Sequence, residues 1–100
     1  MALDGVEKIK DVRIAMIAAA SKTLDYIQSN KYATVEEVMS HILKEVYAHD
    51  DVKRGAIAAA NFTYKYKMKH HLLSNKEILR EVSNSIGDLL SHMNTVGGRD

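Results

Sequence analysis

The fold of this chain is decided by residues 52–72, VKRGAIAAANFTYKYKMKHHL. Apolar side chains recur there at helical spacing on two sides, with Ile57 and Tyr64 on one side and Phe62 roughly opposite. The small residues of the run GAIAAA, 55–60, allow neighbouring helices to approach closely. We therefore predict a central helix that packs against other helices on more than one face.

Three amphipathic segments flank this central helix, and each predicts one further helix. They cover about residues 4–29, 35–48 and 75–93. The first segment buries one stripe by its spacing, formed by Val6, Ile9, Val12, Met16, Ile17, Ala20, Leu24 and Ile27. Arg13 points into that stripe by the same count. Residues 94–100 contain two glycines and are expected to form a flexible tail.

Two of the helix starts carry a recognisable capping pattern. Thr34 is followed three residues later by Glu37, and Ser74 is followed by Glu77 at the same spacing. In such a capping box the hydroxyl and the carboxylate each accept a hydrogen bond from a backbone N–H that has no partner within the helix. These pairs predict that helices begin immediately after residues 34 and 74.

The composition places the chain among ordinary globular proteins. Of its 100 residues, 46% are hydrophobic and 27% are charged, and it contains neither proline nor cysteine. One hundred residues are too few for two independent cores, so we expect a single domain, 1–100, with no internal repeat. The predicted fold class is all-α, a compact bundle of about four helices.

Positive charge is concentrated in one part of the chain. Residues 51–80 contain seven lysines and arginines against two carboxylates, a net charge of +5, whereas the flanking segments are acidic. From Tyr64 to His71 aromatic residues are interleaved with lysines. This combination neutralises phosphates and stacks on bases, and it predicts binding of DNA or RNA. The candidate nucleic-acid-binding residues are Arg54, Lys65, Lys67, Lys69, Tyr64 and Tyr66.

Two other interpretations explain parts of the same pattern. Helical geometry spreads these lysines over more than one side, as expected for a central helix whose long side chains extend past its neighbours. Alternatively, the chain is a protein-interaction or homo-oligomerisation module. The first helix has a three-four spacing suited to pairing with a second chain, carried by Ile9, Val12, Met16, Ala19, Thr23 and Tyr26.

Catalytic and metal-binding motifs are not found. No glycine-rich phosphate loop occurs, and no serine or threonine lies in a nucleophile motif, so we expect neither an enzyme nor a bound cofactor. Glu37, His41, Glu45 and His49 share one helical stripe, but a metal site usually needs a second element, so a solvated face is the simpler interpretation. The longest apolar stretch, 14–20, is too short to cross a membrane. We expect a cytoplasmic protein.

Overall fold

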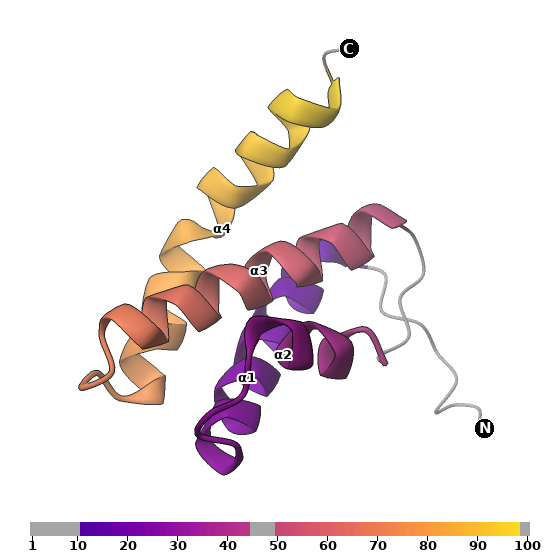
Figure 1. The fold of residues 1–100 in the computed structure, drawn as a ribbon. Helices are drawn as coiled ribbons and strands as arrows, with labels where there is room; N and C mark the ends of the chain where they lie inside the picture. The colour runs from indigo at the N-terminus through magenta and orange to yellow at the C-terminus, as the bar shows by residue number, and fades with distance from the viewer. Residues whose placement is uncertain (1–10, 45–49, 99–100) are drawn as a thin grey trace, which may run out of the picture.

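The computed structural model describes residues 11–44 and 50–98, with side chains up to residue 91. Four helices make up this part of the chain: α1 (Val12–Ser29), α2 (Val35–Ile42), α3 (Asp50–Lys69) and α4 (Asn75–Gly98). No strand occurs in the described ranges. The predicted all-α class and compact arrangement of four helices are confirmed (Figure 1).

The helix boundaries differ from the sequence prediction mainly at the ends. The first helix was predicted to begin at residue 4 and the second to end near residue 48. Residues 4–10 and 45–48 lie outside the described residues. Helix α3 ends at Lys69, before the predicted end at Leu72, and Leu72 is 91% exposed in the following turn. Helix α4 continues to Gly98, beyond its predicted end at residue 93.

Side chains cap three of the helix starts. The Asp11 carboxylate accepts hydrogen bonds from the first turn of α1, at 2.9 Å from the Arg13 nitrogen. In the first predicted capping box, the Glu37 nitrogen donates to Thr34 Oγ1 at 3.2 Å and the Thr34 nitrogen donates to Glu37 Oε1 at 2.9 Å. The corresponding distances between Ser74 and Glu77 are 3.1 and 2.8 Å. Both predicted capping boxes are therefore confirmed.

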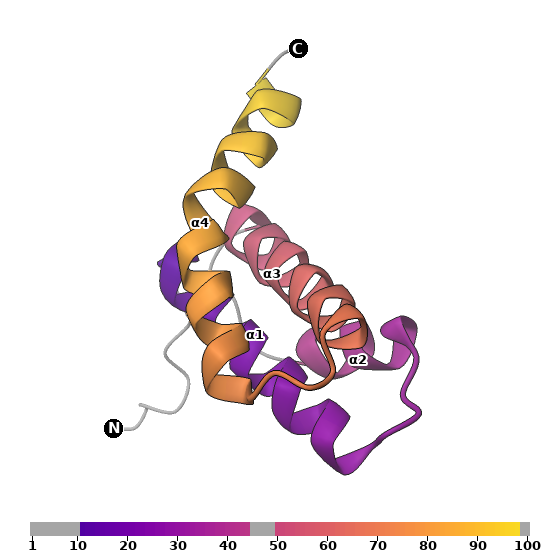
Figure 2. The same cartoon turned by 90° about the vertical axis from the view of Figure 1, so that its left-hand side faces the viewer.

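Helices α1 and α3 form the centre of the molecule. They run in the same general direction and pack on each other more extensively than any other pair (Figure 2). The interface is built from small side chains that are fully or almost fully buried: Ala15, Ala19, Ala56 and Ala59. Gly55 comes so close to α1 that an added Cβ would lie 2.5 Å from Val12 Cγ2. The predicted central role of the small-residue run is thus correct, but α1 shares it.

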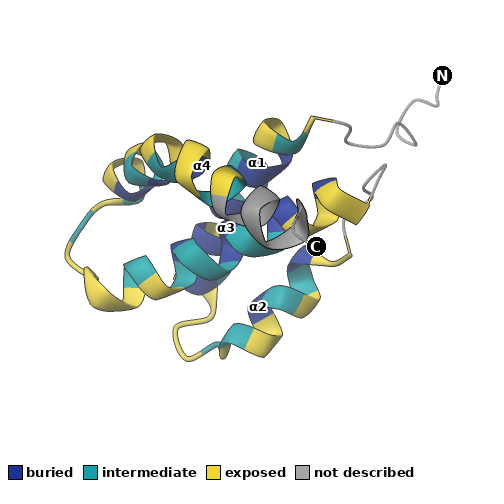
Figure 3. Cartoon of the chain, turned by 90° about the horizontal axis from the view of Figure 1, so that it is seen from above, coloured by how far each residue is buried: buried dark blue, intermediate teal, exposed yellow. Residues whose placement is uncertain are grey.

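Helices α2 and α4 pack on opposite sides of the α1–α3 pair, and each contacts it through corresponding residues. Helix α2 packs Val38 and Ile42 into a cluster with residues of both α1 and α3. On the other side, α4 packs Ile78 and Val82 against Ala20 and Leu24 of α1, and Ile86 lies with Met16 and Ala59. Seen from above, buried residues lie on the inward faces of the helices and exposed residues on the outward faces (Figure 3).

This correspondence reflects an internal repeat, so the expectation of a chain without repeats is wrong. Residues 11–44, the first repeat, correspond to residues 51–84, the second repeat, position by position. Nine positions are identical, beginning with Asp11 and Asp51: the others are Val12/Val52, Ile17/Ile57, Ala18/Ala58, Ala19/Ala59, Ala20/Ala60, Thr23/Thr63, Tyr26/Tyr66 and Glu37/Glu77. The similarity was missed because it is concentrated in alanines and caps, which look unremarkable one at a time.

The two repeats also match in structural detail. Thr23 and Thr63 are both fully buried, and each hydroxyl donates at 2.7 Å to the carbonyl four residues earlier. Tyr32 and Leu72, at corresponding positions in the two interhelical turns, are each 91% exposed. The buried face of α1 lies closer to its alanines than the predicted apolar stripe does. Arg13 is therefore exposed and does not point into the stripe as predicted. The repeated unit is therefore a capped helical hairpin.

Candidate nucleic-acid interface

Three aromatic rings form a ladder along the second half of α3. Phe62, Tyr66 and His70 are four residues apart and so share one face of the helix. The centroids of Phe62 and Tyr66 lie 5.8 Å apart with an interplanar angle of 18°, and those of Tyr66 and His70 lie 4.4 Å apart at 39°. Phe62 and Tyr66 are half-buried and His70 is exposed. We call these three residues the ring ladder.

Lysines border the ring ladder in a groove between α3 and α4. The groove has a volume of about 370 Å³. Its wall on α3 includes Phe62, Lys65, Tyr66 and Lys69, and Leu89 of α4 contributes the other side. Both lysines are exposed, and no carboxylate lines the groove. This α3 groove therefore combines apolar rings with uncompensated positive charge.

The structure brings together some of the predicted site residues and separates others. Lys65, Tyr66 and Lys69 lie in the α3 groove. Arg54 is exposed and falls on the same row of the helix as Lys65 and Lys69, because eleven and fifteen residues correspond to nearly whole numbers of turns. The first three line the groove, and Arg54 lies about three turns before Lys65 on the same side of α3.

Tyr64 and Lys67 lie outside the α3 groove, and each donates hydrogen bonds to backbone carbonyls. The Tyr64 hydroxyl donates to the Ala33 carbonyl at 2.9 Å, which ties α3 to the turn between α1 and α2. Lys67 Nζ donates to the Leu73 carbonyl at 3.1 Å and to the His71 carbonyl at 3.4 Å. Their positions on α3 are explained by these contacts, so they add nothing to the groove.

Sequence reasoning missed Phe62 and His70 as site residues. The signal was present, since both lie four residues from Tyr66 on either side, the spacing at which helical side chains meet. The Tyr-Lys run does not reveal this face, because neighbouring residues lie on different sides of a helix. Leu89 had no local signal, since only the packing of α4 brings it to α3.

The corresponding tyrosine of the first repeat has different surroundings. Tyr26 corresponds to Tyr66, but its ring stacks on His41 of α2, with centroids 4.6 Å apart and an interplanar angle of 28°. In the second repeat Glu81 takes the place of His41, and Tyr66 stacks instead on Phe62 and His70 of its own helix. Asp25 and Ser29 stand where the second repeat has the two groove lysines.

The stripe of glutamates and histidines on the second helix does not form a metal site in the described residues. Glu37 is engaged in its capping box and His41 in the stack with Tyr26, while Glu45 and His49 lie outside the described ranges. Among the side chains that the structure describes, 11–44 and 50–91, no three histidine or acidic groups gather as a metal site would require. None of the helices described is both long and apolar enough to cross a membrane.

The pairing stripe predicted on the first helix is used within the chain. Met16, Ala19 and Thr23 are buried in the present fold, and Ile9 lies outside the described residues. Side chains already covered by α3 and α4 cannot also pair with a second chain. That stripe therefore gives no support for a dimer.

Fold and groove together define a small all-helical protein, built from a repeated helical hairpin, with a basic aromatic groove on one repeat. Comparison with protein families, with curated proteins and with solved structures gave no significant match. The groove is therefore the feature of the chain that points to a function.

Proposed function

We propose that this chain is a non-enzymatic binding protein that holds single-stranded nucleic acid in the α3 groove. The observation that carries the proposal is the ring ladder with Lys65 and Lys69 beside it. Aromatic faces stack on bases whatever their identity, and neighbouring cations neutralise the phosphates. Because the chain has no cysteine, the proposal includes a cytoplasmic location.

A single strand suits this groove better than a duplex. Bases of a duplex are stacked on each other and present only their edges, so rings recessed between two helices cannot reach their faces. Bases of a single strand turn outward and can enter the groove between Tyr66 and Leu89. Arg54, on the same row toward the start of α3, extends the positive track for the backbone.

The decisive test converts the groove to the charges of the first repeat. Lys65→Asp combined with Lys69→Ser introduces the residues that α1 carries at these positions. If both lysines contact phosphates, the salt dependence of binding to a labelled oligothymidine should flatten by about 0.7 log-log units per lost contact. Tyr66→Leu should weaken binding by about 1 to 3 kcal/mol through lost stacking, with circular dichroism confirming the fold.

A matched control removes the same charge outside the groove. Lys53→Asp combined with Lys76→Ser changes two exposed lysines, one at the start of α3 and one at the start of α4. Oligothymidine binding by this variant should stay close to that of the parent. Equal loss in both double variants would show that only net charge matters, and absence of parent binding at low salt would end the proposal.

A second candidate is self-association through the outer face of α1. Ile14 is 62% exposed and lines a shallow hollow of about 380 Å³ together with Arg13, Ile17 and Ala18. A second copy that covered this hollow would remove its apolar surface from water. Sedimentation over a hundredfold concentration range tests it: Ile14→Lys should abolish any concentration-dependent increase in mass, and a parent that stays monomeric throughout excludes it.

A further inference from the structure

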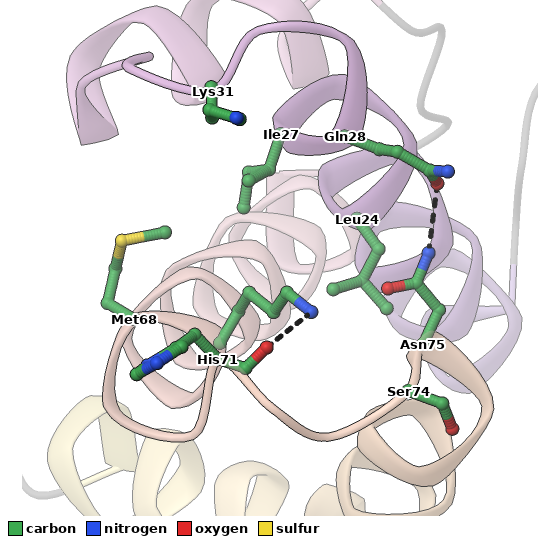
Figure 4. Close-up of a pocket in the computed structure, with 9 residues that line it drawn as sticks. Leu24, Ile27, Gln28, Lys31, Met68, His71, Ser74 and Asn75 are labelled. Carbon is green, nitrogen blue, oxygen red and sulfur yellow. Dashed lines mark hydrogen bonds between the residues drawn. The ribbon is translucent and has the colours of Figure 1, made fainter.

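A second cavity lies between the two interhelical turns, where α1 and α3 end. We call it the terminal cavity; its volume is about 580 Å³, within the range of small-molecule sites. Leu24, Ile27 and Met68 supply its apolar surface, and Lys31, Lys67 and His71 supply nitrogen groups (Figure 4). No carboxylate lines it. It is distinct from the α3 groove, with which it shares no lining residue.

The ammonium group of Lys67 is held in place at this cavity. It donates to the Leu73 and His71 carbonyls, at 3.1 and 3.4 Å. A lysine ammonium has three donors, so one proton remains for a further acceptor. Because two backbone carbonyls already position the group, little side-chain entropy is lost when it binds a ligand. Such a cation is a preorganised anion partner.

The internal repeat explains why one cavity has both an apolar and a charged part. Ile27 and Lys67 occupy corresponding positions in the two repeats, and both line the terminal cavity. The first repeat therefore contributes an apolar side chain where the second contributes a cation. Gln28 and Asn75 close one side, with Asn75 Nδ2 donating to Gln28 Oε1 at 3.3 Å (Figure 4).

We infer that the terminal cavity binds a small organic anion with an apolar body, such as a medium-chain carboxylate. Its carboxylate accepts the remaining proton of Lys67 and is attracted by Lys31 at the rim. Its chain lies against Leu24, Ile27 and Met68, removing apolar surface from water. This site goes beyond nucleic-acid binding and does not depend on it.

The test is a titration with octanoate, followed by ¹H–¹⁵N NMR. Saturable shifts are expected at the amides of Leu24, Ile27 and Met68. Octanamide has the same chain without the charge, and it should bind about tenfold more weakly because charge-assisted hydrogen bonds are the stronger ones. Equal affinity for both compounds, or no saturable shift with octanoate, would overturn the inference.

Two variants locate the charge effect. Lys31→Glu places a carboxylate at the exposed rim and should weaken octanoate binding, whereas Lys53→Glu makes the same charge change at the opposite end of α3 and should leave it unaltered. Lys65→Asp with Lys69→Ser should also bind octanoate like the parent, so failure of the α3 groove proposal does not affect this test. Shifts that map to the α3 groove instead of the terminal cavity would contradict the inference.

Discussion

The two repeats share an inner face and differ in their outer faces. Burial along 11–44 and 51–84 differs in class at only three pairs of positions, Val12/Val52, Leu24/Tyr64 and Ile27/Lys67. Most changes of charge, in contrast, fall at exposed positions, for instance from Asp25 to Lys65, although Ile27/Lys67 is an exception. Packing therefore constrains the hairpin, whereas solvent-exposed positions can diverge at little cost to the fold.

Within the shared interface, one pair of contacts shows compensation in volume. In the cluster on the α2 side, Ala15 lies with Ala56 of α3. At the corresponding contact on the other side, Gly55 faces Met16, and its added Cβ would come within 3.3 Å of Met16 Cγ. A larger residue on one helix is thus accommodated by a smaller one on the other.

The largest expected effect comes from breaking this compensation. Met16→Ala removes a fully buried side chain and should lower the free energy of unfolding by about 2 to 5 kcal/mol. Gly55→Ala should cost about 1 to 3 kcal/mol through overpacking against Val12 and Met16, of which the about 1 kcal/mol that alanine gains in helix propensity offsets a part. Urea denaturation measures both.

The double variant Met16→Ala, Gly55→Ala tests the compensation directly, because it places at this contact the same alanine pair that Ala15 and Ala56 form at the corresponding one. Its loss should be smaller than the sum of the single losses by about 0.5 kcal/mol or more, since the two sites touch. Gly87→Ala is the control: an added Cβ there meets nothing within 4 Å, so this variant should be stabilised. Additive losses would show that Gly55 and Met16 do not compensate each other.

A smaller effect tests whether the two capping boxes are equivalent. Thr34→Ala and Ser74→Ala should each lower the free energy of unfolding by about 1 kcal/mol, because each removes the acceptor for a backbone N–H at a helix start. Thermal and urea unfolding should agree on this value. If one substitution is silent while the other is not, the repeats do not contribute equally to stability at their helix starts.

The smallest effect concerns the pH dependence of the second capping box. The backbone N–H of Ser74, and next its hydroxyl, hold the pKa of Glu77 below its ordinary value of 4.5. A lowered pKa in the folded state stabilises the fold above the ordinary value, and this stabilisation is lost as the pH falls through the folded pKa. Glu77→Gln should therefore be less stable than the parent at neutral pH, with a difference that shrinks in acid. A difference independent of pH would contradict this assignment.

Much of the local structure was predictable because its causes are local. Thr34 with Glu37 and Ser74 with Glu77 identify helix starts within four residues of sequence, and hydrogen bonds over the same span confirm them. The basic aromatic character of the segment around Lys65 was equally visible. The sequence did not show which of residues 64 to 69 line the groove and which face the core. These residues lie on all sides of the helix, and the elements that surround them are distant in sequence.

By itself, therefore, the sequence determined the all-helical class, the capped helix starts and the location of the positive charge. Only the tertiary structure decided which of these side chains are available. Tyr64 is turned to a carbonyl of the first repeat, whereas Tyr66 remains beside Lys65 and Lys69. The physical reason is that α1 and α3 approach through alanines, and this approach fixes which face of α3 each neighbouring helix covers.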